Sequence, residues 1–264
     1  MNHRIVDLHV HSTESDGTFS PTELVTEAKR TGLSAFALTD HDTCSGVSKA
    51  MPCATSAGIE LIPGIELSTD YHGKEVHIVG LYIDIENEQL LKKTAEYRKC
   101  RSERNALMVE ALRKEGLSIT MEELVAENPD CVITRANIAR FLYEHGQIKS
   151  VREAFDRYVG RLKVASTDAV RLIKEAGGTA ILAHPLLYGL SNTNLQKMID
   201  ELKPAGLDGL EAIYSTYTTG EEQQMKRLAR ENGLLISGGS DFHGSNRISL
   251  LAKDGDICIF LTLF

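Results

Sequence analysis

Nine histidine, aspartate and glutamate side chains fall on or just after predicted strands, and they are the residues best suited to chemistry. Imidazole and carboxylate ligands without cysteine suit Zn, Mn or Fe in the divalent state and argue against a structural zinc site. The candidate metal ligands are His9, His11, Asp16, His41, Glu66, His77, His184, Asp241 and His243. Nine ligands exceed the needs of one ion and suit two or three.

His9 and His11 end an apolar segment, residues 5–10, that is predicted to be a strand. Strand side chains alternate with period two, so both imidazoles point to one face. Asp16 follows five residues later, next to Gly17, in a turn. Taken alone, the two histidines are as well explained by ordinary hydrogen bonding at a strand end. The full set favours metal binding, because burying so many titratable groups without a partner is costly.

Predicted strands and helices alternate in the first and last thirds of the chain. The strands are expected at 5–10, 35–39, 59–65, 75–82, 179–183, 210–214 and 234–237, and the apolar tail at 257–264 could add another. The helices are expected at 21–30, 47–57, 168–176, 195–202 and 221–232. Continuous apolar strands are typical of a sheet buried on both faces. The pattern predicts a parallel α/β barrel with its chemistry at the carboxyl ends of the strands.

Residues 88–163 interrupt this alternation. A long charged helix is expected at 88–115, and capping residues predict shorter helices after Thr120, Thr134 and Ser150. No strand is expected here. We therefore predict a helical insertion that overhangs the site. The predicted domains are a barrel made of residues 1–87 and 164–264 and an insertion at 88–163.

The composition restricts the possible partners. A net charge of −8 over 264 residues argues against a broad nucleic-acid surface, but it leaves room for a local basic pocket that binds a phosphorylated ligand. Neither a membrane span nor a signal sequence is expected, and no obligate protein partner is evident. The five scattered cysteines read as reduced thiols, which favours a cytoplasmic protein. Cys44, near His41, is either a further ligand or, more typically, a small buried thiol.

Six motifs together resemble the PHP family, named for polymerase and histidinol phosphatase. They are DLHVHSTESDG (7–17), TDHD (39–42), PGIE (63–66), VHIVG (76–80), AHP (183–185) and GSDFH (239–243). The insertion, with ITR at 133–135 and AFDRY at 154–158, resembles the stand-alone branch that hydrolyses nucleoside 3′,5′-bisphosphates and, in some cases, short oligonucleotides. The resemblance implies a distorted (β/α)7 barrel with a helical insertion.

The resemblance also implies how the ligands are shared among ions. The first ion would be held by His9, His11, Glu66 and Asp241, the second by Glu66 as a bridge with His77 and His184, and the third by Asp16, His41 and His243. Asp42 is expected either to orient a ligand or to be a simple turn residue. The leaving oxygen would be protonated by a metal-bound water or by a site histidine, for which His184 and His243 are the candidates.

Candidate substrate contacts follow from the same resemblance. Arg135 would hold a second phosphate through a bidentate contact, although its residue type alone favours a solvated helix arginine. Arg157 and Arg161 are weaker candidates, because an amphipathic helix face needs no function. Tyr188 and Tyr217 could stack on a base, but each is more typically a half-buried structural tyrosine.

The implied reaction is metal-dependent hydrolysis of a phosphomonoester by a metal-bound hydroxide. The expected substrate is the 3′-phosphate of nucleoside 3′,5′-bisphosphates, with short 5′-phosphorylated oligonucleotides as a further possibility. Two alternatives stay open: a histidinol-phosphate phosphatase, and a non-catalytic metal-binding or regulatory module.

Overall fold

The structure is a computed structural model that describes residues 5–129, 131–150 and 164–244. Its strands are β1 (Val6–Val10), β2 (Ala35–Leu38), β3 (Glu60–Tyr71), β4 (Lys74–Leu81), β5 (Thr179–Leu182), β6 (Gly209–Tyr214) and β7 (Leu235–Gly239). Its helices are α1 (Pro21–Arg30), α2 (Ser45–Ala57), α3 (Glu88–Lys114), α4 (Met121–Glu127), α5 (Arg135–Glu144), α7 (Ser166–Glu175), α8 (Asn192–Leu202) and α9 (Thr219–Glu231), with short 3-10 helices η1 (Pro185–Tyr188) and η2 (Lys203–Ala205). The predicted helix after Ser150, with Arg157 and Arg161, and the tail at 257–264 lie outside the described residues.

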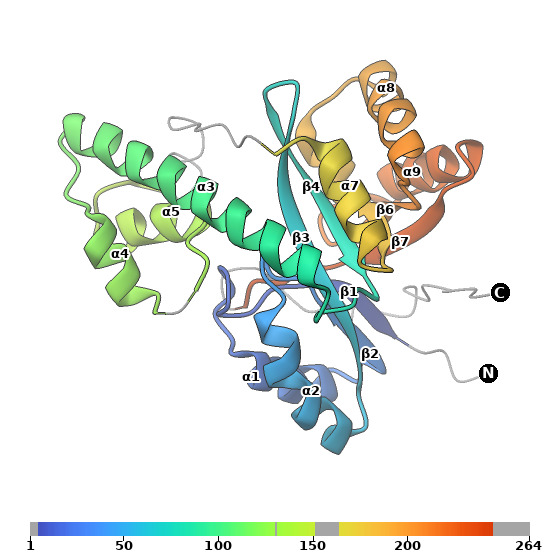
Figure 1. The fold of residues 1–264 in the computed structure, drawn as a ribbon, viewed down its shortest axis with the longest axis horizontal. Coiled ribbons are helices and arrows are strands. Elements are labelled where there is room, and N and C mark those ends of the chain that lie inside the picture. The colour runs from blue at the N-terminus through green and yellow to red at the C-terminus, as the bar shows by residue number, and fades with distance from the viewer. Residues whose placement is uncertain (1–4, 130, 151–163, 245–264) are drawn as a thin grey trace.

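The described strands form one sheet in sequence order, and its two edges meet (Figure 1). Beyond the end of β1, Val10 forms a parallel bridge with Phe242, which follows β7. The His11 N–H donates to the Phe242 carbonyl over 2.8 Å, which extends the contact. The predicted distorted seven-stranded α/β barrel is confirmed.

The prediction of a wholly parallel barrel is wrong for β4, which runs antiparallel to both β3 and β5. Only His72 and Gly73 separate β3 from β4, and their φ angles are 50° and 85°. Two residues with positive φ close a hairpin, whereas a parallel connection needs a dozen or more residues. β3 is also longer than the predicted 59–65, so Glu66 lies within the strand.

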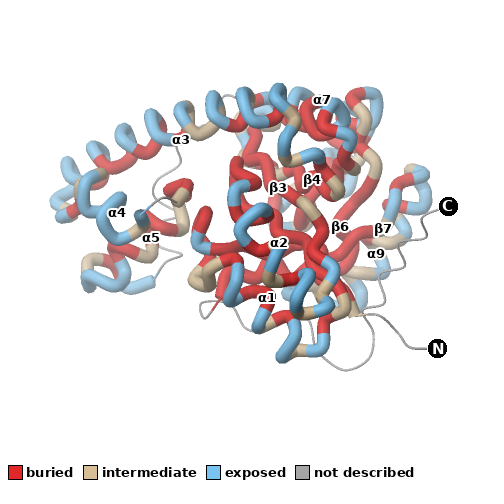
Figure 2. The backbone as a smooth tube through the Cα atoms, turned by 60° about the horizontal axis from the view of Figure 1, so that its bottom comes forward, coloured by how far each residue is buried: buried red, intermediate tan, exposed pale blue. Residues whose placement is uncertain are grey.

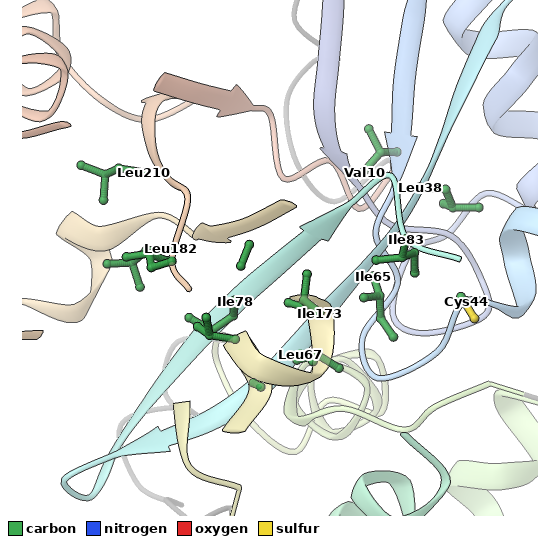
Figure 3. Packing of buried hydrophobic residues seen from close by; sticks show 14 of the residues in the cluster. Val10, Leu38, Cys44, Ile65, Leu67, Ile78, Ile83, Ile173, Leu182 and Leu210 are labelled. Atoms are coloured by element: carbon green, nitrogen blue, oxygen red, sulfur yellow. The ribbon is translucent and has the colours of Figure 1, made fainter. Parts of the chain in front are cut away.

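The main core lies between the outer face of the sheet and the helices (Figure 3). Its buried side chains include Val10, Leu38, Ile65, Leu67, Ile78, Ile173, Leu182 and Leu210. Cys44 belongs to this core and is only 8% exposed, as the buried-thiol interpretation expects. A second cluster comes only from strands and residues beside them, and it fills the barrel interior: Val6, Leu8, Ala35, Ala37, Ile62, Val79, Leu81, Ile181, Ala183 and Ile213.

Strand alternation decides which polar residues face the barrel interior. In β3, Ile65 and Leu67 pack toward the helices, whereas Ile62 packs inside the barrel. Glu66 shares the parity of Ile62 and is fully buried, so its carboxylate belongs to the inner face. His77 holds the corresponding inner position on β4, between residues that pack outward. One end of the barrel interior therefore receives polar side chains.

Helices α3, α4 and α5 pack around an apolar cluster of their own beside the barrel (Figure 1). Leu112 and Phe141 are buried there, while Leu90, at the other end of α3, is buried in the main core. Buried and exposed stretches alternate along α3, as one packed face requires (Figure 2). None of the described helices is apolar enough over a sufficient length to cross a bilayer. The predicted domain boundaries at 88–163 stay a prediction.

Closure of the barrel leaves no room for a side chain at Gly239. A methyl group there would come within 2.3 Å of the His9 Cβ and 2.8 Å of the His9 backbone nitrogen. Gly239→Ala should lower the free energy of unfolding by about 1–3 kcal/mol, because overpacking displaces β1. Urea denaturation measures this. The matched control is Gly220→Ala in α9, where the methyl meets no atom within 4 Å and stability should hold or rise. Equal stability of the two variants would contradict the closure.

Candidate metal and active site

All nine predicted ligand side chains meet at one end of the barrel interior. β1, β3 and β4 supply His9, Glu66 and His77, and the loops after β1, β2, β5 and β7 supply His11, Asp16, His41, His184, Asp241 and His243. All are buried except His77, which is partly buried. Residues 234 positions apart in the chain are thereby placed in one cluster, from His9 to His243.

The ligand atoms fall into four overlapping groups, within each of which they lie no more than 4.8 Å apart. The groups are His11, Asp16, His41 and His243; His9, His11 and Asp241; His9, Glu66 and His184; and His41, Glu66 and His77. Glu66 is central: its Oε1 lies 3.1 Å from His77 Nδ1 and 3.2 Å from His184 Nε2, and its Oε2 lies 2.9 Å from His41 Nδ1. This placement suits a bridging carboxylate, and the assignment of ligands to individual ions stays a prediction.

Unsatisfied atoms in the cluster fit cation binding. Within the described part of the chain, six buried side-chain nitrogen or oxygen atoms lack a hydrogen-bond partner. Four of them belong to predicted ligands: His11 Nδ1, His184 Nδ1, Asp16 Oδ1 and Glu66 Oε2. The two oxygens lie 3.1 Å from His243 Nε2 and 2.9 Å from His41 Nδ1, but without the geometry of a hydrogen bond. An unpaired buried acceptor costs free energy that coordination to a cation would recover. The donor set, imidazoles with carboxylates, suits borderline divalent ions.

The protonation states of the side chains in the cluster also favour the binding of cations. Burial, with the nearby imidazole of His243, lowers the pKa of His11 to about 3, so this ring is neutral and offers a lone pair. Burial alone would raise the pKa of Glu66, but the surrounding imidazoles, that of His77 first, hold it well below its ordinary value. Burial disfavours protonation of His9, yet the carboxylates around it, Glu66 first, hold its pKa well above the ordinary value. A divalent ion would displace such a proton.

Glu211 contacts the cluster, and the sequence reasoning missed it. It lies on β6, is 2% exposed, and its Oε1 lies 3.1 Å from His9 Nδ1. Its Oε2 accepts a hydrogen bond of 2.6 Å from the His184 N–H. Because Glu211 holds Nδ1 of His9, the Nε2 atom is turned toward the cluster, as outer carboxylates do for metal-ligating histidines. The available signal was an acidic residue inside the apolar strand segment GLEAIY, 209–214.

Asp7 and Asp40 brace the loops that carry ligands, and they too were missed. Asp7 accepts hydrogen bonds from Ser240 N–H at 2.9 Å and from its hydroxyl at 2.5 Å. Asp40 accepts from the Ser12 N–H and hydroxyl and from the Ser15 hydroxyl, at 2.7–2.8 Å. Each serine is next to a predicted ligand in sequence. Burial raises the pKa of both carboxyl groups to about 6, although these hydrogen bonds oppose it.

Three non-glycine residues at the site have left-handed backbone. Asp42 and Asp241 have φ of 53°, and His184 has φ of 26°. Such conformations cost about 1–3 kcal/mol each and persist where surrounding contacts enforce them. The hydrogen bond from His184 N–H to Glu211 is one such contact. Strain at the site is thus offset by groups that also aim the ligands.

Asp42 joins α3 to the loop after β2. Its Oδ2 accepts from Arg101 Nε and Nη2 at 2.9 and 2.6 Å, and its carbonyl accepts from Arg98. Its Oδ1 accepts from the Ser68 N–H, and the Ser68 hydroxyl lies 3.4 Å from His41 Nδ1. The predicted orienting role of Asp42 would therefore act on His41 through Ser68, and it stays a prediction.

Glu75 connects the cluster to the insertion and was not predicted. Its Oε1 lies 3.3 Å from His77 Nε2. Its Oε2 lies 3.1 Å from Arg135 Nη2 and 3.5 Å from Arg104 Nη1. Burial would raise the pKa of Glu75, but the contact with His77 and the charge of Arg135 hold it below the ordinary value. An ionised Glu75 thus steadies both a predicted ligand and a predicted substrate-binding arginine.

Tyr188 and Tyr217 have structural hydrogen bonds. The Tyr188 hydroxyl accepts from the His77 N–H at 2.9 Å and donates to the Ala183 carbonyl at 2.8 Å. The Tyr217 hydroxyl accepts from the Leu186 N–H at 3.0 Å. Both rings therefore fix η1 beside the site, which favours the structural interpretation over base stacking.

A cavity of about 760 Å³ opens over the cluster, within the usual size of small-molecule sites. Its lining includes the predicted ligands Asp16, His41, Glu66, His77, His184, Asp241 and His243, with Arg135, Arg140 and Tyr143 from α5 and Leu187 from η1. Arg140, which the sequence reasoning missed, donates to the Asp16 carbonyl. Cationic side chains and the candidate metal cluster thus share one cavity.

The barrel, the acid–imidazole cluster and the cavity define a metal-dependent phosphoesterase, and known proteins agree. The PHP domain model matches residues 7–165. A 5′-3′ exoribonuclease of Haemophilus influenzae is 38% identical over 245 residues, covering 90% of this chain and 89% of the relative. A 3′,5′-nucleoside bisphosphate phosphatase of Chromobacterium violaceum is 33% identical over 248 residues, covering 90% and 87%.

A solved structure shows the same fold. An amidohydrolase from Chromobacterium violaceum, with bound sulfate and no metal, matches with a TM-score of 0.88 at 32% identity and covers 96% of this chain and 93% of its own. This chain belongs to the PHP family. It is a hydrolase of phosphoric esters.

The Glu211 contacts predict a loss of metal affinity when they are removed. Glu211→Gln keeps the side-chain volume but replaces one acceptor with a donor, so it cannot accept hydrogen bonds from both His9 Nδ1 and the His184 N–H. Metal affinity should fall about 10- to 100-fold, as for other outer partners of metal ligands. Calorimetric titration of the chelator-stripped protein with Mn²⁺ or Zn²⁺ measures this.

The matched control for that titration is Glu231→Gln, an exposed glutamate at the end of α9, which should bind metal as the wild type does. Circular dichroism of each metal-free variant checks that the fold is kept. An unchanged affinity in Glu211→Gln would show that the ligands do not depend on this carboxylate.

Proposed function

We propose that this protein hydrolyses the 3′-phosphate of nucleoside 3′,5′-bisphosphates and releases inorganic phosphate and a nucleoside 5′-phosphate. The observation that carries the proposal is the presence of Arg135 and Arg140 in the same cavity as seven of the nine candidate ligands. A substrate with two phosphates would place one over the ligand cluster and the other on the arginines. The Chromobacterium violaceum relative, named for this activity, supports the same substrate.

The nine ligands would hold two or three divalent ions of Mn, Zn or Fe. Such ions, when bound, would acidify water for attack on phosphorus and neutralise the phosphoryl oxygens. Glu66 would keep the ligand groups together as their common carboxylate. His184 and His243 line the cavity and are the proposed donors of the proton that the leaving 3′-oxygen takes up.

The arginines would bind the 5′-phosphate while keeping their protein contacts. Arg135 is ion-paired with Glu75, and Arg140 donates to the Asp16 carbonyl. A guanidinium has five N–H donors in a fixed fork, so it can hold a protein acceptor and a phosphate at once. The proposed role of Arg157 falls on a residue that the structure does not describe. A histidinol phosphate, with one phosphate, would leave the arginines without a ligand.

A second substrate class, 5′-phosphorylated oligonucleotides, is supported by the Haemophilus influenzae relative, which is named a 5′-3′ exoribonuclease. Both substrates present the same bond. Water would attack the phosphorus attached to the 3′-oxygen, the bond from phosphorus to that oxygen would break, and the oxygen would take a proton. With the bisphosphate, this phosphate leaves as inorganic phosphate. With the oligonucleotide, it stays as the 5′-phosphate of the shortened strand.

Removing the charge of Arg135 should lower kcat/KM only for substrates that carry a 5′-phosphate. With Mn²⁺, Arg135→Gln should lower kcat/KM for adenosine 3′,5′-bisphosphate about 10- to 100-fold, since a charged hydrogen bond contributes about 1.5–3 kcal/mol. Its kcat/KM for adenosine 3′-phosphate should change little. Phosphate release measures both rates.

The control for this comparison is Arg113→Gln, at an exposed arginine of α3 outside the cavity lining, which should behave as the wild type with both substrates. The kcat/KM of a 5′-phosphorylated dinucleotide, assayed in parallel, shows how the second substrate class compares with the bisphosphate. Equal losses on both adenosine substrates in Arg135→Gln would place Arg135 away from the 5′-phosphate. Absence of phosphate release from the bisphosphate by the wild type would refute the proposed activity.

A further inference from the structure

Two large apolar side chains remain exposed on the wall of the cavity. Tyr143 is 51% exposed and Leu187 is 53% exposed, and both line the cavity over the ligand cluster. Exposed apolar side chains are ordinary when they lie singly on a convex surface. In a concave site they mark the place where the apolar part of a ligand is covered.

Helix α5 presents charge and apolar surface along one wall. Arg135, Arg140 and Tyr143 all line the cavity. At 1.5 Å per residue, Arg135 and Tyr143 are separated by about 12 Å along the helix axis. Arg140, which contacts the Asp16 carbonyl, lies between them and next to the cluster. A ligand with one phosphate over the cluster and the other on the arginines would extend its remaining part toward Tyr143.

Leu187 is held firmly on the barrel side. Its N–H donates to the His184 carbonyl over 3.0 Å, within η1. Both neighbours of Leu187 are also held: the Leu186 N–H donates to the Tyr217 hydroxyl, and the Tyr188 hydroxyl donates to the Ala183 carbonyl. Tyr143 is likewise carried on a regular helix. Two apolar groups on rigid elements, one from the insertion and one from the barrel, cost little to order around a ligand.

We propose that Tyr143 and Leu187 form a nucleobase subsite that holds the base by apolar and stacking contact between the insertion and the barrel. The inference rests on the proposed function, and it adds the part of the substrate that the metal ligands and arginines do not touch. Because every base has an aromatic face, such a subsite should accept all four bases. It also reassigns the stacking role from Tyr188 and Tyr217, whose hydroxyls are used within the fold.

The test compares a nucleotide with the same sugar bisphosphate lacking a base. Wild-type enzyme with Mn²⁺ should hydrolyse adenosine 3′,5′-bisphosphate with a kcat/KM at least about tenfold above that of 1-deoxyribose 3,5-bisphosphate. Tyr143→Ala and Leu187→Ala should each lower kcat/KM for the nucleotide about 5- to 100-fold and leave the abasic substrate within about twofold. Tyr143→Phe keeps the ring face and should retain the nucleotide rate.

The matched control is Leu107→Ala, at a leucine of α3 that is 69% exposed and outside the cavity lining, and it should match the wild type on both substrates. Thermal melts confirm that every variant is folded. If the wild type hydrolyses both substrates equally well, the base subsite is refuted while the proposed function stands. Parallel losses on both substrates in Tyr143→Ala and Leu187→Ala would refute it as well. If the wild type hydrolyses neither, both proposals fall together.

Discussion

The structure depends on one electrostatic constraint: imidazoles and carboxylates are buried at one end of an apolar barrel, where charge is expensive. Glu66 is the centre of the arrangement, because nitrogens of His41, His77 and His184 all lie 2.9–3.2 Å from its two oxygens. These contacts offset part of the cost but leave buried ligand atoms unsatisfied within the described residues. Cations shared among the groups would remove the rest of that cost and turn an unfavourable cluster into a catalytic one.

The barrel converts this constraint into geometry. Strands β1, β3 and β4 carry His9, Glu66 and His77, and the loops after four strands bring the other six candidate ligands to the same end. Around them, Asp7, Asp40 and Glu211 accept hydrogen bonds from groups in or beside the ligand loops. Because Asp7 and Glu211 lie on strands β1 and β6, a change in strand register would move the candidate ligands that they contact. The phosphoesterase site is therefore tied to closure of the barrel, and the insertion adds arginines and apolar surface above it.

Much of this was accessible from sequence, for identifiable reasons. A histidine or carboxylate at the end of an apolar strand stands out by residue type, so candidate ligands such as His9, Glu66 and Asp241 can be selected from the sequence, and the structure brings them together. The antiparallel direction of β4 does not follow from residue pattern, because side chains alternate with period two in parallel and antiparallel strands alike; only the two-residue connection at 72–73 distinguishes them. Glu211 and Arg140 were missed because their roles depend on partners far away in the chain. The periodicity of apolar residues indicates which face of an element is buried, but it does not indicate which residues of other elements pack against that face.

The most direct test of the central claim is anomalous diffraction from crystals of this protein grown with Mn²⁺. The account predicts two or three anomalous peaks inside the cluster, with Glu66 coordinating two of them and each peak within bonding distance of the nearest imidazole or carboxylate atoms. A cluster without anomalous density at saturating Mn²⁺, its side chains paired only with one another, would contradict it. The buried acids and imidazoles would then need an explanation other than cations.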